Sequence, residues 1–503
     1  MNPTTVNMKI RKGVTLHDGT PFTAKNIVHS IGYIKDKKNG CWSKSYVAEI
    51  QHIDIIDEYT IRFNLKKPNA AFLMRLVYPP GFAMSIKALE EDVALREAGR
   101  TQLKIKNAKK KLSKLEARAE KSATKGDKKA KKAAAKVKKQ KKAIQKLQKK
   151  HTRLSVKTRR AKNADIHPVG TGPFMFEDRS IGNWTKLKRN PSWWFANVLG
   201  KPDVPYFDGY TFVIIPDASI QLANFRAGKI HRMLLSPAQF NSEKRKSVNS
   251  MQIFEMDYPM TVFLTFNHAE GPCKNKLVRK AISHAIDRKA IIKGVMFDLA
   301  TPAACIFPSD SWGHNPDLKP VTYNPELSKK LLQEAGYAAG LKIKGLAGMT
   351  SGTLVAAVKH MLAKVGIDWT VDILDPAAAA DRLRNREYDM SSTSWPSILD
   401  PDLPVSGMYH PTGAFNFGRS DNKAAISLIE MGVEENDYVK RQKLYWDLEK
   451  VLYDNYEDAW LWHTRLAFAF DKNVIGLDAK TNRRFSNLWI RSYFTTGLWF
   501  KNQ

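Results

Sequence analysis

The chain has 503 residues, of which 43% are hydrophobic, so it is long enough for about three domains with large cores. Its formal net charge of +33 is concentrated in residues 100–162, where 27 Lys and Arg stand against three acidic residues. The other 440 residues carry a net charge of only +9. The high net charge is therefore no evidence that the chain as a whole binds nucleic acid.

Cys41, Cys273 and Cys305 are too few and too scattered for a disulfide framework or a metal site, and they allow at most one bridge. The sequence has no run of 18 apolar residues, so we expect no transmembrane helix. Residues 1–19 lack the apolar segment of a secretory signal, so we expect no signal peptide in the chain as it stands.

The first segments predict a strand, a helix and a β-hairpin. Residues 8–14 predict a strand, and residues 21–34 predict a helix with Thr23 as its N-cap. Residues 52–65 contain two β-rich runs separated by Asp57-Glu58, which is typical of a β-hairpin.

The basic block, residues 100–162, repeats apolar and small residues at alternating spacings of three and four in two arms, interrupted by Thr-Lys-Gly-Asp at 124–127. This pattern predicts an antiparallel helical hairpin with a thin seam. We expect only marginal stability, because the seam is rich in Ala and the Lys side chains repel one another. The predicted seam consists of Ile105, Ala108, Leu112, Leu115 and Ala119 in the first arm, and Ala130, Ala133, Val137, Gln140, Ile144, Leu147, His151 and Leu154 in the second.

Beyond residue 164 the excess of Lys and Arg ends and the composition returns to that of an ordinary globular protein. Residues 167–178 and 184–190 predict paired strands, and residues 210–230 predict a strand followed by a helix. Residues 275–296 predict one strongly amphipathic helix. From 324 to 470 helical and strand patterns alternate, which predicts an α/β lobe with a largely parallel sheet.

No enzyme or metal motif is present, so we predict no catalytic residue, no metal site and no cofactor. The Gly170 and Gly172 pair is followed at once by Pro173 and lacks the rest of a phosphate-binding loop. Ser283, His284 and Asp287 fall within one predicted helix, whereas a catalytic triad converges from separate elements.

The basic block allows two interpretations. Its Lys and Arg could bind a polyanion such as nucleic acid or an anionic surface through counterion release. It contains no Phe, Trp or Tyr for stacking on bases and matches no DNA-binding motif. We favour a solvated insertion, and keep polyanion contact through residues 100–162 as the alternative.

Several segments, taken in order, resemble the extracellular solute-binding proteins of peptide-type ABC importers, the dipeptide- and oligopeptide-binding class. The matching segments are residues 8–31, 56–73, 167–177, 187–194, 205–230, 261–272, 278–303 and 311–337. The resemblance covers nearly the whole chain except the basic block, which is an insertion relative to the family.

The resemblance implies a bilobed α/β periplasmic-binding-protein fold that closes on a peptide or peptide-like solute and delivers it to a membrane permease. It implies a small accessory domain at 1–99 and 163–165, a first lobe at 166–260 and 475–503, and a second lobe at 261–474, with the helical hairpin inserted at 100–162. We expect a monomer in the periplasm or outside the cell.

The family has a signal peptide and several dozen residues before the segment that matches residues 8–14. Because this sequence lacks them, we expect an N-terminally truncated chain whose accessory domain is incomplete. A decayed paralogue without activity is therefore a further hypothesis.

The family also has a Gly-Trp-x-x-Asp segment whose Asp pairs with the α-amine of the peptide. Here Trp395 matches, but Ile398 stands three residues later, so Asp400 and Asp402 become the candidate acids, with a simple turn as the competing interpretation. We predict Trp395, Asp400, Asp402 and Asn416 as ligand-binding residues. Arg382, Arg384 and Arg386 could bind a carboxylate, although we expect them to lie on a helix surface.

Overall fold

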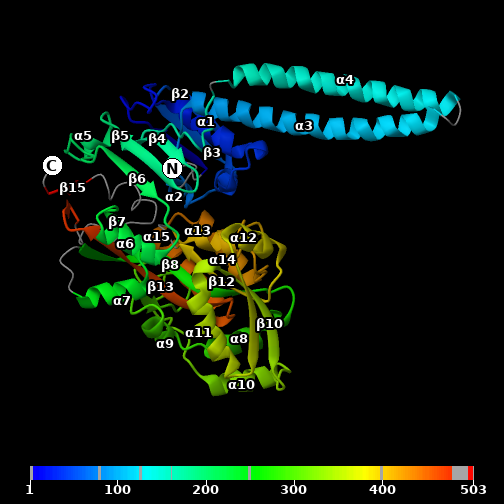
Figure 1. Ribbon diagram of the computed structural model, residues 1–503. Coiled ribbons are helices and arrows are strands. Elements are labelled where there is room, and N and C mark those ends of the chain that lie inside the picture. The colour runs from blue at the N-terminus through cyan, green and yellow to red at the C-terminus, as the bar shows by residue number, and fades with distance from the viewer. Residues whose placement is uncertain are drawn as a thin grey trace.

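The computed structural model describes residues 4–77, 81–123, 127–159, 161–246, 251–396, 400–477 and 497–501. A small domain from the first segments carries a long helical hairpin, a sheet from residues 174–213 lies beside this domain, and most of the later elements lie below them (Figure 1). None of the described helices is long and apolar enough to cross a membrane. All three cysteines are free thiols.

The small domain is a three-stranded antiparallel sheet, in the order β1-β3-β2, covered by one helix. Ile31, Ile61, Phe63 and Phe72 are almost fully buried in its core. The predicted β-hairpin and the predicted helix start after Thr23 are confirmed. Its elements are β1 (Thr5–Lys9), α1 (Ala24–Lys35), η1 (Lys37–Asn39), η2 (Trp42–Val47), β2 (Ile50–Asp57), β3 (Thr60–Leu65) and α2 (Phe72–Arg75).

The prediction of a strand at 8–14 is wrong in its position, because β1 lies at Thr5–Lys9. Gly13 has a φ of 77°, a left-handed turn conformation, so the chain leaves the sheet before the predicted strand would end. The apolar residues Ile10 and Val14 are buried on either side of the turn at residues 12–13, outside the strand.

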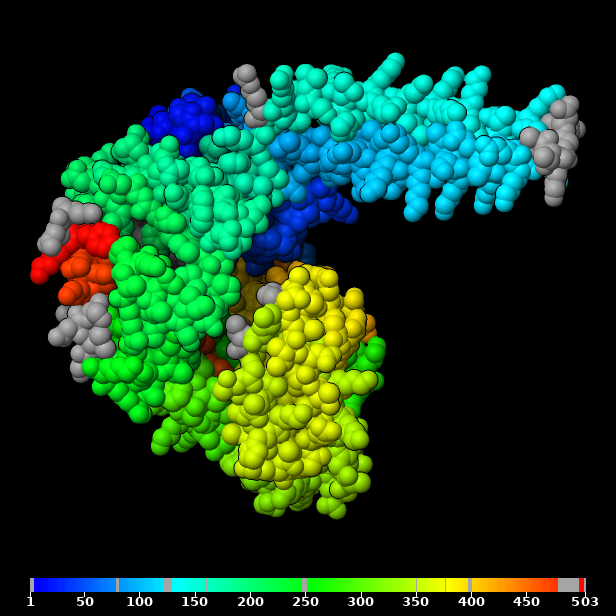
Figure 2. Space-filling view, in the orientation of Figure 1, coloured from blue at the N-terminus to red at the C-terminus, as the bar shows by residue number. Residues whose placement is uncertain are grey.

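The basic block forms two long helices, α3 (Ile86–Ala123) and α4 (Asp127–Lys157), which pack against each other and extend away from the body of the protein (Figures 1 and 2). Every predicted seam residue is at least partly buried, while most of the residues between them are exposed. Ile144 is the most buried seam residue, at 6% exposure, and the Gln140 amide donates to the Ala108 carbonyl at 3.0 Å. The predicted helical hairpin is therefore confirmed.

The hairpin is anchored through the first turns of α3, which begins well before the predicted start at residue 100. Asp92 is fully buried there and accepts hydrogen bonds from Tyr33 at 2.5 Å and Arg96 at 2.6 Å. Arg100 donates to the Lys38 carbonyl at 2.8 Å. The insertion is thus a continuation of a helix that belongs to the small domain.

The first lobe contains a three-stranded antiparallel sheet, in the order β4-β5-β6, and a short strand, β7 (Arg232–Leu235). The predicted pairing of a strand within residues 167–178 with one within 184–190 is confirmed, although the first strand begins only at Phe174. The other elements are β4 (Phe174–Ser180), β5 (Trp184–Arg189), α5 (Phe195–Val198), β6 (Gly209–Val213), α6 (Ala218–Arg226), α7 (Pro237–Lys246) and the pair β14 (Val474–Ile475) and β15 (Trp499–Phe500).

Two long strands, β8 (Met251–Phe266) and β13 (Asp458–Asp471), pair along almost their whole length and cross from one lobe to the other. At one end β13 pairs with β7 of the first lobe, and at the other end β8 pairs with β12 (Met390–Pro396) of the second lobe. The register shifts between Trp460 and Trp462 and again between His463 and Arg465, in the middle of the crossing. The predicted boundary at 260/261 falls inside β8, and the domain boundaries stay a prediction.

The second lobe is built on the strand order β11-β10-β12-β8-β13, with helices on its faces. β10 runs parallel to β11 and β12, but β8 and β13 are antiparallel, so the prediction of a largely parallel sheet is wrong. The chain enters the second lobe along β8 and leaves it along β13, so these two strands run in opposite directions. The sheet of the second lobe is therefore mixed, with parallel and antiparallel pairs. The remaining elements are η4 (Pro272–Lys274), α8 (Lys276–His284), α9 (Arg288–Gly294), β9 (Ala300–Pro302), α10 (Pro325–Glu334), β10 (Leu341–Gly348), η5 (Met349–Ser351), α11 (Gly352–Ala363), β11 (Ile367–Leu374), α12 (Pro376–Asn385), α13 (Asp402–Met408), α14 (Lys423–Glu434) and α15 (Tyr438–Asp454).

The single helix predicted for residues 275–296 is also wrong, because the structure has two helices, α8 and α9. Asp287 caps α9 by accepting a hydrogen bond from the Ala290 N–H at 3.0 Å. The buried Arg288 guanidinium donates to the carbonyls of Ser283 and Ile286, which stabilises the break between the helices.

Candidate ligand-binding cleft

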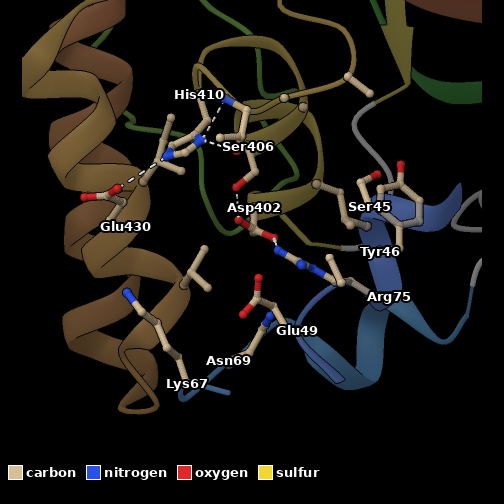
Figure 3. Close-up of a pocket in the computed structure, with 18 of the residues that line it drawn as sticks. Ser45, Tyr46, Glu49, Lys67, Asn69, Arg75, Asp402, Ser406, His410 and Glu430 are labelled. Carbon is tan, nitrogen blue, oxygen red and sulfur yellow. Dashed lines mark hydrogen bonds and ion pairs between the residues drawn. The ribbon is translucent and has the colours of Figure 1, made fainter. Parts of the chain in front are cut away.

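A cavity of about 390 Å³ lies where the small domain faces the second lobe. Residues from 45–49 and 67–75 line one side, and residues from 402–415 and 429–434 line the other (Figure 3). The molecule is also hollowed between the first lobe and the second lobe in Figure 2. Ligand cavities of this size fall in the range of about 300–1,000 Å³ that is usual for small-molecule sites.

Strand pairing in the small domain positions its side of the cavity. Ile50 of β2 pairs with Leu65 of β3, and the Lys66 N–H donates to the Glu49 carbonyl at 2.9 Å. Glu49 therefore lies next to the segment that follows β3. That segment reaches the second lobe, where the Ala70 N–H donates to the Val433 carbonyl at 2.8 Å.

A buried ion pair joins the two sides. Arg75, at the end of α2, donates to the Asp402 carboxylate at 2.7 Å, and the Ser406 hydroxyl donates to its other oxygen. Asp402 is fully buried, and the Arg75 side chain is 11% exposed. Burial lowers the pKa of Arg75, but the nearby Asp402 carboxylate more than offsets this and the pKa lies above its usual value. Lys67 and Glu434 form a second, more exposed pair at 3.5 Å.

Replacing Asp402 by Asn should lower the free energy of unfolding by about 2 kcal/mol, because hydrogen bonds to charged groups are worth about 1.5–3 kcal/mol. The Arg75 guanidinium would remain largely buried and lose its anionic partner. Urea unfolding followed by Trp fluorescence measures the change. Glu434→Gln, which breaks the exposed pair with Lys67, is the matched control and should change stability by less than about 1 kcal/mol. Equal losses in the two variants would contradict the prediction.

Of the predicted ligand residues, the structure brings Asp402 to the cavity wall but surrounds Asp400 with protein. Asp400 is 5% exposed, and both of its oxygens accept hydrogen bonds from Arg441 of α15 at 2.8 Å. It also accepts the Asp402 N–H at 2.9 Å. This arrangement supplies a structural ion pair, and a ligand role for Asp400 stays a prediction.

Trp395 and Asn416 lie just behind the cavity wall. The Trp395 ring packs edge-on against Phe415, which lines the cavity, with ring centroids 4.5 Å apart. The Asn416 amide donates to the carbonyls of His410 and Ser420, so it fixes the loop that carries Phe415. Ile398 lies outside the described residues.

Arg382 and Arg384 lie on α12 and pair with acidic side chains on its surface, whereas Arg386 is the C-cap residue of that helix. Arg382 pairs with Asp372 at 2.6 Å and with Glu387 at 3.0 Å, and Arg384 pairs with Asp381 at 2.6 Å. None of these arginines lines the cavity.

Sequence reasoning missed Glu49, Asn69 and Arg75 as cavity residues. They come from strand ends and a short helix that carry no recognised motif, and only contact with residues 402–434 brings them to one site. The available signal was weak: a single Arg at the end of the apolar segment Phe72–Arg75. Within the described residues, three or more His, Cys, Asp or Glu nowhere converge in a way that could hold a metal ion.

Comparison with known proteins identifies a family with this architecture. The family model "Bacterial extracellular solute-binding proteins, family 5 Middle" matches residues 2–416. The glutathione-binding protein GsiB of Escherichia coli K12 is 22% identical over 497 residues, covering 96% of this chain and 82% of GsiB.

Solved structures show the same fold. The periplasmic binding protein DppA of Helicobacter pylori, in complex with the peptide STSA, superposes with a TM-score of 0.75 at 21% identity, covering 100% of this chain and 87% of DppA. NikZ of Campylobacter jejuni, in complex with Ni(L-His), gives a TM-score of 0.70 at 19% identity, covering 94% of this chain and 84% of NikZ. The predicted bilobed periplasmic-binding-protein fold is confirmed, and the chain belongs to the bacterial extracellular solute-binding proteins of family 5.

Proposed function

We propose that this protein binds a peptide or a peptide-like solute at the cavity between its small domain and its second lobe and delivers it to an ABC permease in the membrane, acting in the periplasm or outside the cell. The observation that carries the proposal is the cavity between the small domain and the second lobe, in a chain of this family. Relatives with this fold are named for binding glutathione, a peptide or a nickel–histidine complex.

The geometry suits binding coupled to closure. The two walls of the cavity come from segments that are more than 300 residues apart, and β8 and β13 are the long strands that pass between the lobes. A solute that contacts both walls binds the closed arrangement better than an open one, and it shifts the population toward closure. The protein then needs no chemical step to perform its role.

Thermal shift and calorimetry with a panel of solutes test the proposal. The panel contains di- to pentapeptides, glutathione and nickel–histidine complexes, and at least one class should raise the melting temperature, since a ligand that binds only the folded state stabilises it. Ala414→Trp is the matched variant, because residue 414 is exposed on the cavity wall and an indole would fill the cavity. We expect this variant to fold normally and to lose the shift.

Two outcomes would overturn the proposal. In the first, no solute shifts the wild-type protein while a family member such as GsiB responds in the same assay. In the second, the shift persists in Ala414→Trp, which would place binding elsewhere. Contact of the hairpin with a polyanion stays a separate prediction, which rests on the charge of residues 100–162.

A further inference from the structure

The charge of the α3–α4 hairpin is distributed unevenly between its two long edges, and two ion pairs across the seam show where these edges lie. Lys141 pairs with Glu116 at 2.9 Å, and Lys150 pairs with Glu97 at 2.6 Å. Relative to the seam residues, which repeat every seven positions, Glu116 and Lys141 flank the seam on one side. Glu97 and Lys150 flank it on the other side.

The edge that contains Lys150 carries most of the charge, and we call it the basic edge. It comprises two rows of residues, each repeating every seven positions: the row that flanks the seam on that side and the row directly outside it. Within residues 101–121 and 129–157 the two rows have fifteen positions, of which thirteen are Lys or Arg and none is acidic. All fifteen side chains are exposed. They are Lys104, Asn107, Lys111, Lys114, Arg118 and Lys121 on α3, and Lys129, Lys132, Lys136, Lys139, Ala143, Lys146, Lys150, Arg153 and Lys157 on α4.

The opposite edge, defined by the two corresponding rows beside Glu116 and Lys141, is close to neutral. Only five of its fourteen positions are basic and two are acidic, so its net charge is +3, against +13 on the basic edge. Its residues are Gln102, Lys106, Lys109, Ser113, Glu116 and Glu120 on α3, and Lys131, Ala134, Lys138, Lys141, Gln145, Gln148, Thr152 and Ser155 on α4. The hairpin is therefore a rod with one strongly positive edge.

The stability of the hairpin does not explain this edge. The register that pairs Glu97 with Lys150 places Lys111 opposite Lys136, since each lies fourteen residues further toward the tip. Like charges that face each other across a seam weaken it, whereas residues of opposite sign at these positions would stabilise it. The arrangement instead presents a continuous row of positive charge to something outside the chain. The hairpin extends away from the body of the protein, so the edge is accessible (Figure 2).

The shape of the edge favours a flat partner. Residues 129–157 form one continuous helix, so at 1.5 Å per residue the edge runs along α4 for about 40 Å. A bilayer meets such a rod on one side only, whereas a flexible polyanion can wrap around it and use basic residues on every side. The concentration of charge on a single edge therefore fits a planar anionic surface better than a wrapped polymer.

The residue types favour the same partner. Eleven of the thirteen basic residues are Lys, a compact hydrated charge that suits the diffuse negative potential above anionic lipid headgroups. Nucleic-acid recognition favours the planar Arg guanidinium, and single strands stack on aromatic rings, which residues 100–162 lack altogether.

We propose that the basic edge binds the anionic phospholipid headgroups of a bilayer, with the hairpin lying along the membrane surface. This interaction keeps the protein close to the membrane in which the proposed permease lies. It goes beyond solute binding and does not depend on which solute the cavity holds.

The test uses the full-length protein and sedimentation with two kinds of vesicle, phosphatidylcholine alone and phosphatidylcholine with about one-third phosphatidylglycerol. The protein should sediment with the anionic vesicles and stay in solution with the neutral ones. Binding should weaken steeply as the salt concentration rises, because the interaction is between exposed charges. This salt series needs no variant, and binding that does not change with salt would overturn the inference.

Two matched triple variants test whether one edge is responsible. Each replaces three exposed lysines by Gln, two in α3 and one in α4, so both lose the same charge, and Gln has nearly the helix propensity of Lys. The basic-edge variant should bind the anionic vesicles at least about tenfold more weakly, and the opposite-edge variant should change binding less than about threefold. The basic-edge variant carries Lys104→Gln, Lys111→Gln and Lys139→Gln, and the opposite-edge variant carries Lys106→Gln, Lys109→Gln and Lys138→Gln.

Three further outcomes would overturn the inference: no binding to the anionic vesicles, equal weakening in the two variants, or tighter binding to a DNA duplex than to the vesicles at the same salt concentration. The last would assign the edge to nucleic acid instead. Both variants should keep the wild-type helix content by circular dichroism and the wild-type response to the solute panel. Solute binding is scored separately, so failure of the membrane assignment leaves the proposed function intact, and the reverse also holds.

Discussion

Replacing Arg441 by Met should lower the free energy of unfolding by about 3–5 kcal/mol, because it leaves the Asp400 carboxylate buried without a counter-charge. Both Asp400 oxygens accept hydrogen bonds from Arg441 at 2.8 Å, and the two side chains are only 4% and 8% exposed. The guanidinium also donates to the Gly432 carbonyl at 2.8 Å and lies over the rings of Trp312 and Tyr445. Its loss therefore removes packing between α14 and α15 as well as the ion pair.

Urea unfolding measured by Trp fluorescence gives the change, and a double variant separates its causes. Asp400→Leu combined with Arg441→Met should recover most of the loss, because an apolar pair of similar size leaves no buried charge. Arg382→Met, which breaks exposed pairs with Asp372 and Glu387, should cost less than about 1 kcal/mol. Wild-type stability in Arg441→Met would contradict the prediction. If the double variant keeps its fold and still binds solute, the ligand role predicted for Asp400 is wrong.

Replacing Asp458 by Asn should stabilise the protein at pH 8 by about 4 kcal/mol, and have little effect near pH 4, because about three pH units separate the folded and unfolded pKa values of this carboxyl. Complete burial at the start of β13 raises the pKa of Asp458 to about 7, although a hydrogen bond from the Tyr409 hydroxyl at 2.5 Å favours the ionised form. The folded state therefore holds a proton that the unfolded chain, in which the carboxyl has its ordinary pKa of 3.8, has released. Stability from this group is present below pH 4 and is lost as the pH rises toward 7.

The measurement is the difference in unfolding free energy between wild type and Asp458→Asn, taken at intervals from about pH 4 to about pH 8.5. The difference should grow between the two pKa values of the carboxyl and level off above the higher one. Tyr409→Phe removes the hydrogen bond that favours the Asp458 carboxylate, which raises the pKa of Asp458 in the folded state further. The stability of this variant should therefore keep falling to a higher pH than that of the wild type. A difference between wild type and Asp458→Asn that stays constant with pH would contradict the assignment.

The sequence alone predicted the elements whose pattern is local. The spacing of three and four in residues 105–154 identified the residues between α3 and α4, because a helix places such residues on one face whatever surrounds it. The β2–β3 hairpin and the start of α1 were predictable for the same reason, since turn and capping preferences act over a few residues. The ordered segments that resemble the family were sufficient to predict the bilobed fold.

Only the tertiary structure decided which polar groups pair with protein and which remain open to a solute. Asp400 and Asp402 are two residues apart, yet one is bound by Arg441 of the same lobe and the other by Arg75 of the small domain. Asn69 lies at the cavity wall, and within the described part of the chain its side-chain amide has no hydrogen-bond partner. Secondary structure follows from interactions between near neighbours in the chain. The free energy of a buried charge depends on partners brought from hundreds of residues away, and one sequence does not specify them.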